Sequence, residues 1–289
     1  MKQQTLIRPA ELAELDQDQV LILDCRFELA DTARGRRDHD AAHIPGAVYA
    51  DLDEDLSGPG QESGLGRHPL PTAESLAASL ARLGWDGHKP VVAYDDRSGA
   101  IAARAWWLLR VSGHDKVAVL EGGWAAWRDA GLPEDSSPAG NPAPRVQAAA
   151  LNLSLDTRCM VSSQQLQTEL QDHSCLLIDA RARERYLGEV EPIDAVAGHV
   201  PGARNRPYMD NLDPNGRFKD ADTLRATFSE LLGDQRPEQV VHMCGSGVTA
   251  CHNLLAMEHA GLTGSRLYPP SWSGWISDPV RPIEIGVTR

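Results

Sequence analysis

One cysteine has surroundings suited to nucleophilic chemistry. Cys244 follows a mostly apolar run, Val240–Met243, that predicts a buried strand. Gly245 and Gly247 come next, and a helical pattern begins at about Thr249. Such a loop turns successive backbone N–H groups inward, and the helix start adds roughly half a positive charge. A thiol held there ionises more readily than a free one, so Cys244 is a predicted nucleophile.

The loop after this cysteine is a predicted anion cradle. It consists of Gly245, Ser246, Gly247, Val248 and Thr249. The chain has five cysteines, an odd number, with no Cys-x-x-Cys pair and no Cys/His ligand spacing. We therefore expect neither a disulfide framework nor a metal site, and no organic cofactor is indicated. The other cysteines are expected to be ordinary core residues.

Composition limits the classes of function. The 289 residues carry a formal net charge of −13, which argues against a nucleic-acid-binding surface. The N-terminus lacks the apolar core of a signal peptide, and no apolar stretch approaches the ~18 residues of a membrane span. Free thiols suit a reducing compartment, so we expect a cytoplasmic protein without membrane partners.

The chain reads as a duplication. Landmarks recur in the same order and at nearly the same separation: Asp24 and Asp179, His43 and His199, Gly84 and Gly233, Asp95 and Cys244, Trp124 and Trp272, Trp127 and Trp275. Strands alternate with helices in each half, which predicts an α/β fold of two tandem domains, each a parallel sheet with helices on both faces. We expect domains at 1–135 and 158–289, joined by a Pro- and Ser-rich linker at 136–157.

The two halves differ where the chemistry is expected. Asp95 stands at the position that corresponds to Cys244, and Asp96 adds a second negative charge. A carboxylate cannot act as the thiol does. The N-terminal half is therefore predicted to be inactive.

These features resemble the two-domain rhodanese family of sulfurtransferases. The resemblance is carried by the tandem halves, the His-x-Pro-Gly-Ala segments at His43 and His199, and the loop Cys244–Thr249, which is most similar to that of 3-mercaptopyruvate sulfurtransferases. The segment Ser271–Trp275 resembles the family's aromatic segment, with Gly274 where an acidic residue is usual.

The resemblance implies a reaction. The thiolate of Cys244 would take sulfur from 3-mercaptopyruvate, release pyruvate and become a persulfide, which passes its sulfur to a thiol, thioredoxin or cyanide. Relatives that prefer thiosulfate carry basic residues after the cysteine. Gly245 and Ser246 stand there in this chain, which favours mercaptopyruvate.

The resemblance also assigns a substrate-binding arginine. Arg185 matches it, and a guanidinium suits a carboxylate because it donates two parallel hydrogen bonds. A second arginine usually follows a Glu-Pro pair, but Ile193 and Asp194 stand there in this chain. The candidates for its replacement are Arg204 and Arg206. Arg181 and Arg183 are expected to be exposed, and Asp179 is expected to fix the loop that bears Arg185.

A proton relay of Ser246, His43 and an aspartate is a further implication of the resemblance. The aspartate is Asp31, Asp38 or Asp40, and the sequence does not choose among them. Because His199 recurs at the equivalent position, His43 has the alternative interpretation of a histidine that holds a turn by hydrogen bonds.

The sequence also bears on three other functions. A cysteine-based phosphatase needs an arginine six residues after the cysteine, and Ala250 stands there. A non-catalytic binding module on the same scaffold would not need an intact cradle around Cys244. A thiosulfate:cyanide sulfurtransferase would use the same mechanism with another donor.

Overall fold

The chain forms two compact units. The computed structural model describes residues 4–59, 64–136 and 151–287. Unit 1 consists of Met1–Gly58, Leu70–Asp156 and Pro214–Phe218, and unit 2 of Pro59–Pro69, Thr157–Asp213 and Lys219–Arg289. Of the linker predicted at 136–157, residues 137–150 lie outside the described residues. Two short segments therefore belong to the other half's unit: Pro59–Pro69 to unit 2 and Pro214–Phe218 to unit 1.

Unit 1 is built on a five-stranded parallel sheet. Its strands are β1 (Leu6–Ile7), β2 (Leu21–Asp24), β3 (Val48–Tyr49), β4 (Val91–Tyr94) and β5 (Val117–Leu120). Their order in the sheet is β1-β5-β4-β2-β3, and every pairing is parallel. The central strands are buried along their length, which explains why they read as continuous apolar runs instead of alternating ones.

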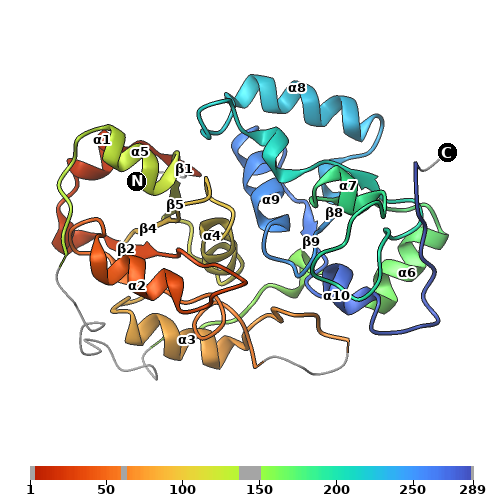
Figure 1. Cartoon of the computed structure of the whole chain (residues 1–289), viewed down its shortest axis with the longest axis horizontal. Coiled ribbons are helices and arrows are strands. Elements are labelled where there is room, and N and C mark those ends of the chain that lie inside the picture. The colour runs from red at the N-terminus through yellow and green to blue at the C-terminus, as the bar shows by residue number, and fades with distance from the viewer. Residues whose placement is uncertain (1–3, 60–63, 137–150, 288–289) are drawn as a thin grey trace. The chain divides into compact units, whose positions relative to one another are not determined.

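Helices cover both faces of this sheet. They are α1 (Pro9–Ala13), α2 (Arg34–Ala41), α3 (Ala73–Arg82), α4 (Ala102–Val111) and α5 (Gly123–Asp129). In Figure 1, α5 lies on one side of the strands and α2 and α3 on the other. The helix α3 begins where the Thr72 hydroxyl accepts a hydrogen bond from the Ser75 N–H, and it buries Leu76 and Leu80 on one face.

Unit 2 repeats the scheme with four strands. They are β6 (Leu176–Asp179), β7 (Arg204–Asn205), β8 (Val240–Met243) and β9 (Arg266–Leu267), in the order β7-β6-β8-β9, all parallel. The helices are α6 (Ser163–Gln171), α7 (Arg183–Tyr186), α8 (Ala221–Leu232), α9 (Ala250–His259) and α10 (Ser271–Trp275). The predicted α/β fold of two parallel sheets is confirmed.

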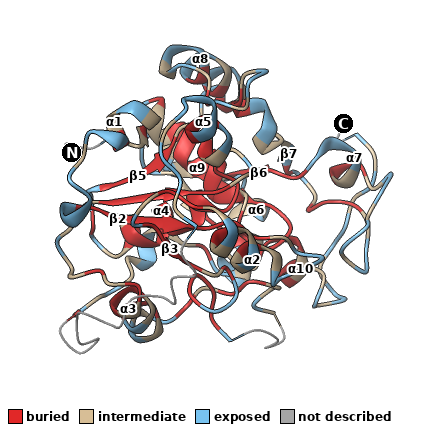
Figure 2. Cartoon of the chain, turned by 60° about the vertical axis from the view of Figure 1, so that its left-hand side comes forward, coloured by how far each residue is buried: buried red, intermediate tan, exposed pale blue. Residues whose placement is uncertain are grey.

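The core of unit 2 contains the tryptophans that the repeat singled out. Trp272 and Trp275 are buried in one cluster with Leu177, Val241 and Met243. Figure 2 shows strands such as β2, β5 and β6 buried, while helices such as α1 and α8 keep an exposed side and α9 is buried along most of its length. Among the described residues, no helix has the length and apolar content needed to span a membrane.

The duplication extends to individual hydrogen bonds. Asp24 binds the guanidinium of Arg26 in unit 1, and Asp179 binds that of Arg181 in unit 2. The two histidines of the repeat also correspond. The Nδ1 of His43 contacts the backbone oxygen of His39 at 2.6 Å, and the Nδ1 of His199 contacts that of Tyr186 at 2.7 Å. Each thus fastens a turn in its own unit.

Candidate active site

The loop after β8 holds the predicted nucleophile. The Gly247 N–H donates a hydrogen bond to the Cys244 Sγ, at 3.2 Å. The helix α9 begins directly after Thr249, as the sequence predicted, so the positive end of a helix lies at this loop. Cys244 has an exposed fraction of 2%. A charge on its sulfur would be shielded from water, and the surrounding dipoles act on it strongly.

Gly247 is required by the shape of this loop. Its φ is +79°, in the left-handed region, and a Cβ built there would lie 2.4 Å from the backbone oxygen of Pro269. A second set of bonds fixes the loop to α10. The Trp272 N–H donates to the Cys244 oxygen at 3.0 Å, and the Ser273 N–H donates to the Gly245 oxygen at 2.9 Å.

Arg181, which we expected to be exposed, is buried. Its guanidinium binds the carboxylate of Asp179 and lies 4.6 Å from the ring centre of Trp272. Burial alone would lower its pKa, but the carboxylates of Asp179 and Glu191 and the sulfur of Cys244 outweigh burial and raise the pKa of Arg181. The charge of Arg181 therefore acts on the cradle, and Asp179 positions this arginine rather than Arg185.

Arg185 faces the cradle and is held by two carboxylates. Its Nη2 lies 2.7 Å from Glu191 Oε1 and 3.1 Å from Asp194 Oδ2. Burial raises the pKa of Glu191, but the hydrogen bond from Arg185 and those from two backbone N–H groups outweigh it and lower the pKa. A Cβ at Gly245 would lie 3.7 Å from both terminal nitrogens of Arg185. The guanidinium is therefore next to the residue that follows Cys244.

Two residues of this site escaped the sequence analysis. His68 Nδ1 lies 2.7 Å from the Ser246 hydroxyl, and both side chains are buried. Arg67 binds Asp194, with Nη1 2.8 Å from Oδ1. Both residues lie in Pro59–Pro69, the segment that belongs to unit 2. The sequence signal that could have pointed to them is an Arg-His pair in a loop rich in Gly and Pro, because functional side chains are often carried by loops.

The histidine predicted for the relay and two of its three candidate aspartates have partners within unit 1. His43 is 2% exposed, and its ring stacks on that of His39 at 4.0 Å. Asp31 is exposed and pairs with Arg37, and Asp38 pairs with Arg34. The histidine that is hydrogen-bonded to Ser246 in the structure is His68 and not His43.

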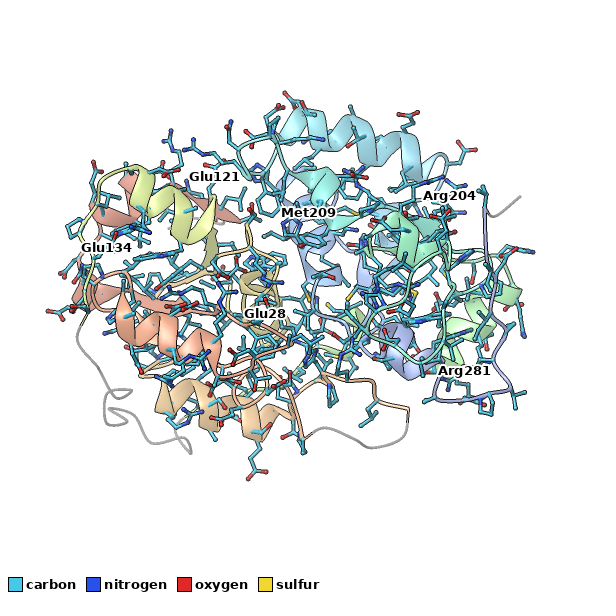
Figure 3. The ribbon with its side chains drawn as sticks, viewed as in Figure 1. Glu28, Glu121, Glu134, Arg204, Met209 and Arg281 are labelled. Atoms are coloured by element: carbon cyan, nitrogen blue, oxygen red, sulfur yellow. The ribbon has the colours of Figure 1, made fainter. Side chains whose placement is uncertain are left out.

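The arginines proposed as replacements for the missing one are engaged elsewhere in unit 2. Arg206 lies 4.1 Å from the ring centre of Phe228 and binds the Asn211 side chain. Arg204 is exposed and binds the backbone oxygen of Leu231 (Figure 3).

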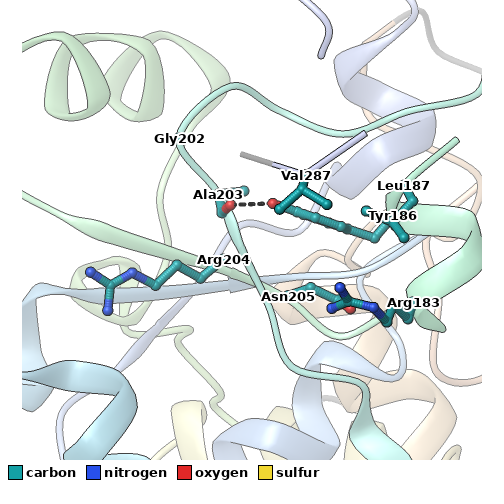
Figure 4. A pocket seen from close by; sticks show the side chains of 8 residues that line it. All are labelled: Arg183, Tyr186, Leu187, Gly202, Ala203, Arg204, Asn205 and Val287. Carbon is teal, nitrogen blue, oxygen red and sulfur yellow. Dashed lines mark hydrogen bonds between the residues drawn. The ribbon is translucent and has the colours of Figure 1, made fainter. Parts of the chain in front are cut away.

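A separate cavity of about 420 Å³ lies beside β7. Its lining is Arg183, Tyr186, Leu187, Gly202, Ala203, Arg204, Asn205 and Val287. It includes no residue of the cradle. Across it the Tyr186 hydroxyl donates to the Ala203 oxygen, and the Arg204 guanidinium extends away from the other lining residues (Figure 4).

In unit 1 the corresponding cradle is filled by its own carboxylate. Asp95 follows β4 as Cys244 follows β8, and its backbone oxygen accepts the Trp124 N–H at 2.8 Å. Its side chain accepts hydrogen bonds at 2.7 to 2.8 Å from four backbone N–H groups, those of Arg97, Gly99, Ile101 and Ala102. The fold of this loop thus binds an anion, and in unit 1 that anion is part of the chain.

Charge around the cradle of unit 2 is balanced among six side chains. They are the cations Arg67, Arg181 and Arg185 and the anions Asp179, Glu191 and Asp194. His242, on β8, contributes no charge near neutral pH because burial lowers its pKa to about 3. An anionic substrate would meet guanidinium groups that are already held in place.

The comparisons with known proteins agree with this arrangement. The family described as "Rhodanese-like domain" matches the chain twice, over residues 9–130 and 162–278. The chain therefore belongs to the rhodanese family, as a tandem pair of its domains.

Individual relatives carry two kinds of name. A Pseudomonas aeruginosa protein named "Probable 3-mercaptopyruvate sulfurtransferase" is 45% identical over 275 residues, which cover 95% of each chain. The thiosulfate sulfurtransferase of Mus musculus is 35% identical over 261 residues, 88% of this chain and 84% of that one. Among solved structures, the 3-mercaptopyruvate sulfurtransferase SseA from Escherichia coli has a TM-score of 0.78 and 30% identity, covering 93% of this chain and 99% of that one.

Proposed function

We propose that this protein is a sulfurtransferase that carries sulfur as a persulfide on Cys244. The observation that carries the proposal is the hydrogen bond from the Gly247 N–H to the Cys244 sulfur, inside a loop faced by Arg67 and Arg185. A thiolate and the persulfide it forms are both anions. Preorganised N–H groups and fixed guanidinium charges stabilise such anions without reorganisation during the reaction.

The first half-reaction is nucleophilic. The Cys244 thiolate attacks the sulfur of 3-mercaptopyruvate, so that an S–S bond forms as the carbon–sulfur bond breaks. The electron pair stays on carbon as the enolate of pyruvate, which then takes up one proton. Cys244 is left as a persulfide.

The proton for the enolate requires a nearby donor. We assign this role to the Ser246 hydroxyl, whose partner is His68 at 2.7 Å. The imidazole can donate one proton and accept another, and it can therefore return a proton to the hydroxyl after the transfer.

The second half-reaction returns the cysteine. A thiol such as that of thioredoxin, or cyanide, attacks the outer sulfur of the persulfide, the S–S bond breaks, and the Cys244 thiolate leaves with the electron pair. Because all five cysteines are free and the persulfide needs reducing acceptors, we propose the cytoplasm as the place of action. Unit 1, with Asp95 in its cradle, is proposed to carry no sulfur.

The test compares Cys244→Ser with the wild type. With 3-mercaptopyruvate and a thiol acceptor, the wild type should release pyruvate and sulfide, while Cys244→Ser should release neither. Cys175→Ser makes the same chemical change outside the cradle and should retain activity. Sulfide release by Cys244→Ser would refute the proposal, and full inactivity of the wild type would favour a binding module.

Thiosulfate is the alternative donor, because the Mus musculus relative is named a thiosulfate sulfurtransferase. A purified sample assayed with both donors should show the higher kcat/KM for 3-mercaptopyruvate. Gly245 and Ser246 add no positive charge for a dianion. A preference for thiosulfate would change the donor and leave the role of Cys244 intact.

A further inference from the structure

Arg67 reaches the cradle from a segment far from it in the sequence. We infer that Arg67 is the second guanidinium that binds the donor's carboxylate and that it fills the role of the arginine missing at Ile193. This inference rests on the proposed function, since the donor concerned is the one that Cys244 attacks.

One carboxylate aligns Arg67 with Arg185. Asp194 accepts from Arg67 Nη1 through Oδ1, at 2.8 Å, and from Arg185 Nη2 through Oδ2, at 3.1 Å. A Cβ placed on Gly245 would lie 3.4 Å from Arg67 Nη2 and 3.7 Å from the terminal nitrogens of Arg185. The two guanidinium groups therefore flank the same point, one residue from the nucleophile.

Arg67 keeps a hydrogen-bonding edge for a ligand. Its Nε is buried and has no hydrogen-bond partner among the described residues. In a guanidinium, Nε and Nη2 form one edge, whose spacing matches the two oxygens of a carboxylate. Asp194 takes Nη1, which belongs to the other side of the group. A buried donor without a partner is costly, and a bound carboxylate would satisfy it.

The segment that carries Arg67 is fitted to α10. The Arg67 N–H donates to the Ser273 hydroxyl at 3.0 Å. A Cβ at Gly66 would lie 2.5 Å from the Pro270 oxygen, and a Cβ at Gly274 would lie 2.9 Å from the Gly64 oxygen. Any side chain at 274 would push this segment away.

Two departures from the family pattern thus have one physical explanation. Gly274 replaces an acidic residue and makes room for the segment, and the segment brings Arg67 to the cradle. Because Arg67 supplies the second guanidinium at the cradle, no arginine is needed at position 193. The residue there, Ile193, is uncharged and about half exposed.

The experiment measures KM and kcat for 3-mercaptopyruvate in four variants. Arg67→Met should raise KM by about 10- to 100-fold with little change in kcat, because the carboxylate is bound equally in the ground and transition states. Arg183→Met, an exposed arginine of α7, is the matched control and should leave KM unchanged. The double variant Arg67→Met/Ile193→Arg should recover most of the lost affinity. Arg67→Lys, which keeps the charge but lacks the paired edge, should still have a raised KM.

A binding measurement separates this inference from the proposed function. Titration of Cys244→Ser with 3-mercaptopyruvate reports binding without transfer, and adding Arg67→Met to that variant should weaken binding by the same factor. Equal affinity of the single and double variants, or a KM of Arg67→Met within about twofold of wild type, overturns the inference. A third outcome is possible. If the wild type transfers no sulfur, but Arg67→Met still weakens binding in the Cys244→Ser background, the proposed transfer reaction is refuted and the role of Arg67 in binding stands.

Discussion

The Nδ1 nitrogen of His68 lies 2.7 Å from the hydroxyl oxygen of Ser246, although 178 positions separate the two residues. Ser246 is the second residue after Cys244, the proposed sulfur carrier. Both members of the pair are buried, so a proton can pass between them without an intervening layer of bulk water. The pair thus connects the cradle to an imidazole, a group that can both donate and accept a proton.

Removing either member of this pair should slow the chemical step. We expect Ser246→Ala and His68→Gln each to lower kcat by about 100-fold or more with little effect on KM. Because the two act as one unit, the double variant should be no slower than the worse single one. Steady-state pyruvate formation measures this, with His88→Gln, at an exposed site, as the control. Unchanged kcat in both single variants would remove the relay from the mechanism.

The two glycines of the cradle should respond differently to alanine. Gly247→Ala forces a Cβ to within 2.4 Å of the Pro269 oxygen at a φ of +79°, so it should lower the free energy of unfolding by about 1–3 kcal/mol and abolish activity. Gly245→Ala meets the Arg67 and Arg185 guanidinium groups first, at 3.4 and 3.7 Å. It should keep its stability and raise KM. Urea unfolding measures the stability of each variant, and steady-state kinetics measure its KM. A stable Gly247→Ala together with an unstable Gly245→Ala would contradict this account.

Asp95 should be a stability residue of unit 1. Asp95→Ala would leave the buried N–H groups of Gly99, Ile101 and Ala102 and the partly buried one of Arg97 without their acceptor. It should lower the free energy of unfolding by at least about 3 kcal/mol. Asp95→Asn retains one acceptor oxygen and should cost less. Sulfur transfer per folded molecule should be unchanged in both. A folded Asp95→Ala protein that cannot transfer sulfur would show that unit 1 takes part in the reaction.

Asp55 should make the stability of unit 1 depend on pH. Burial raises its pKa to about 6, although Arg82 opposes this. An acid with a raised pKa in the folded state stabilises the fold below its unfolded pKa, and this contribution is lost as pH rises toward about 6. Asp55→Asn cannot ionise, so its unfolding free energy relative to wild type should rise between pH 4 and pH 6 and then level off. Urea unfolding at several pH values in this range measures both free energies. A difference between Asp55→Asn and wild type that does not change with pH would contradict the raised pKa of Asp55.

The parts of the site that depend on local patterns could be predicted from the sequence. The strand before Cys244, the glycines after it and the helix start at Thr249 lie within one short stretch, and the structure has β8, the turn and α9 there. The repeat allowed the fold to be predicted as well, because the same alternation of strands and helices occurs twice. Local sequence sufficed for both.

The rest of the site depends on distant contacts. Arg181 is buried because Trp272, far along the chain, covers its guanidinium, and a charged residue in a charged loop carries no sign of that. Arg67 and His68 enter the site because Gly66 and Gly274 allow close packing between Pro59–Pro69 and α10. His43 was predicted from the resemblance, and in the structure it and its repeat counterpart His199 each contact a backbone oxygen at a turn.

The central claim is that Cys244 carries the sulfur, and intact-mass measurement tests it most directly. Protein incubated with 3-mercaptopyruvate and no acceptor should gain the mass of one sulfur atom, located on the peptide that contains Cys244. Addition of a thiol should then remove that sulfur, and Cys244→Ser should gain no mass at all. Sulfur found on another cysteine, or a Cys244→Ser protein that is labelled like the wild type, would contradict the account.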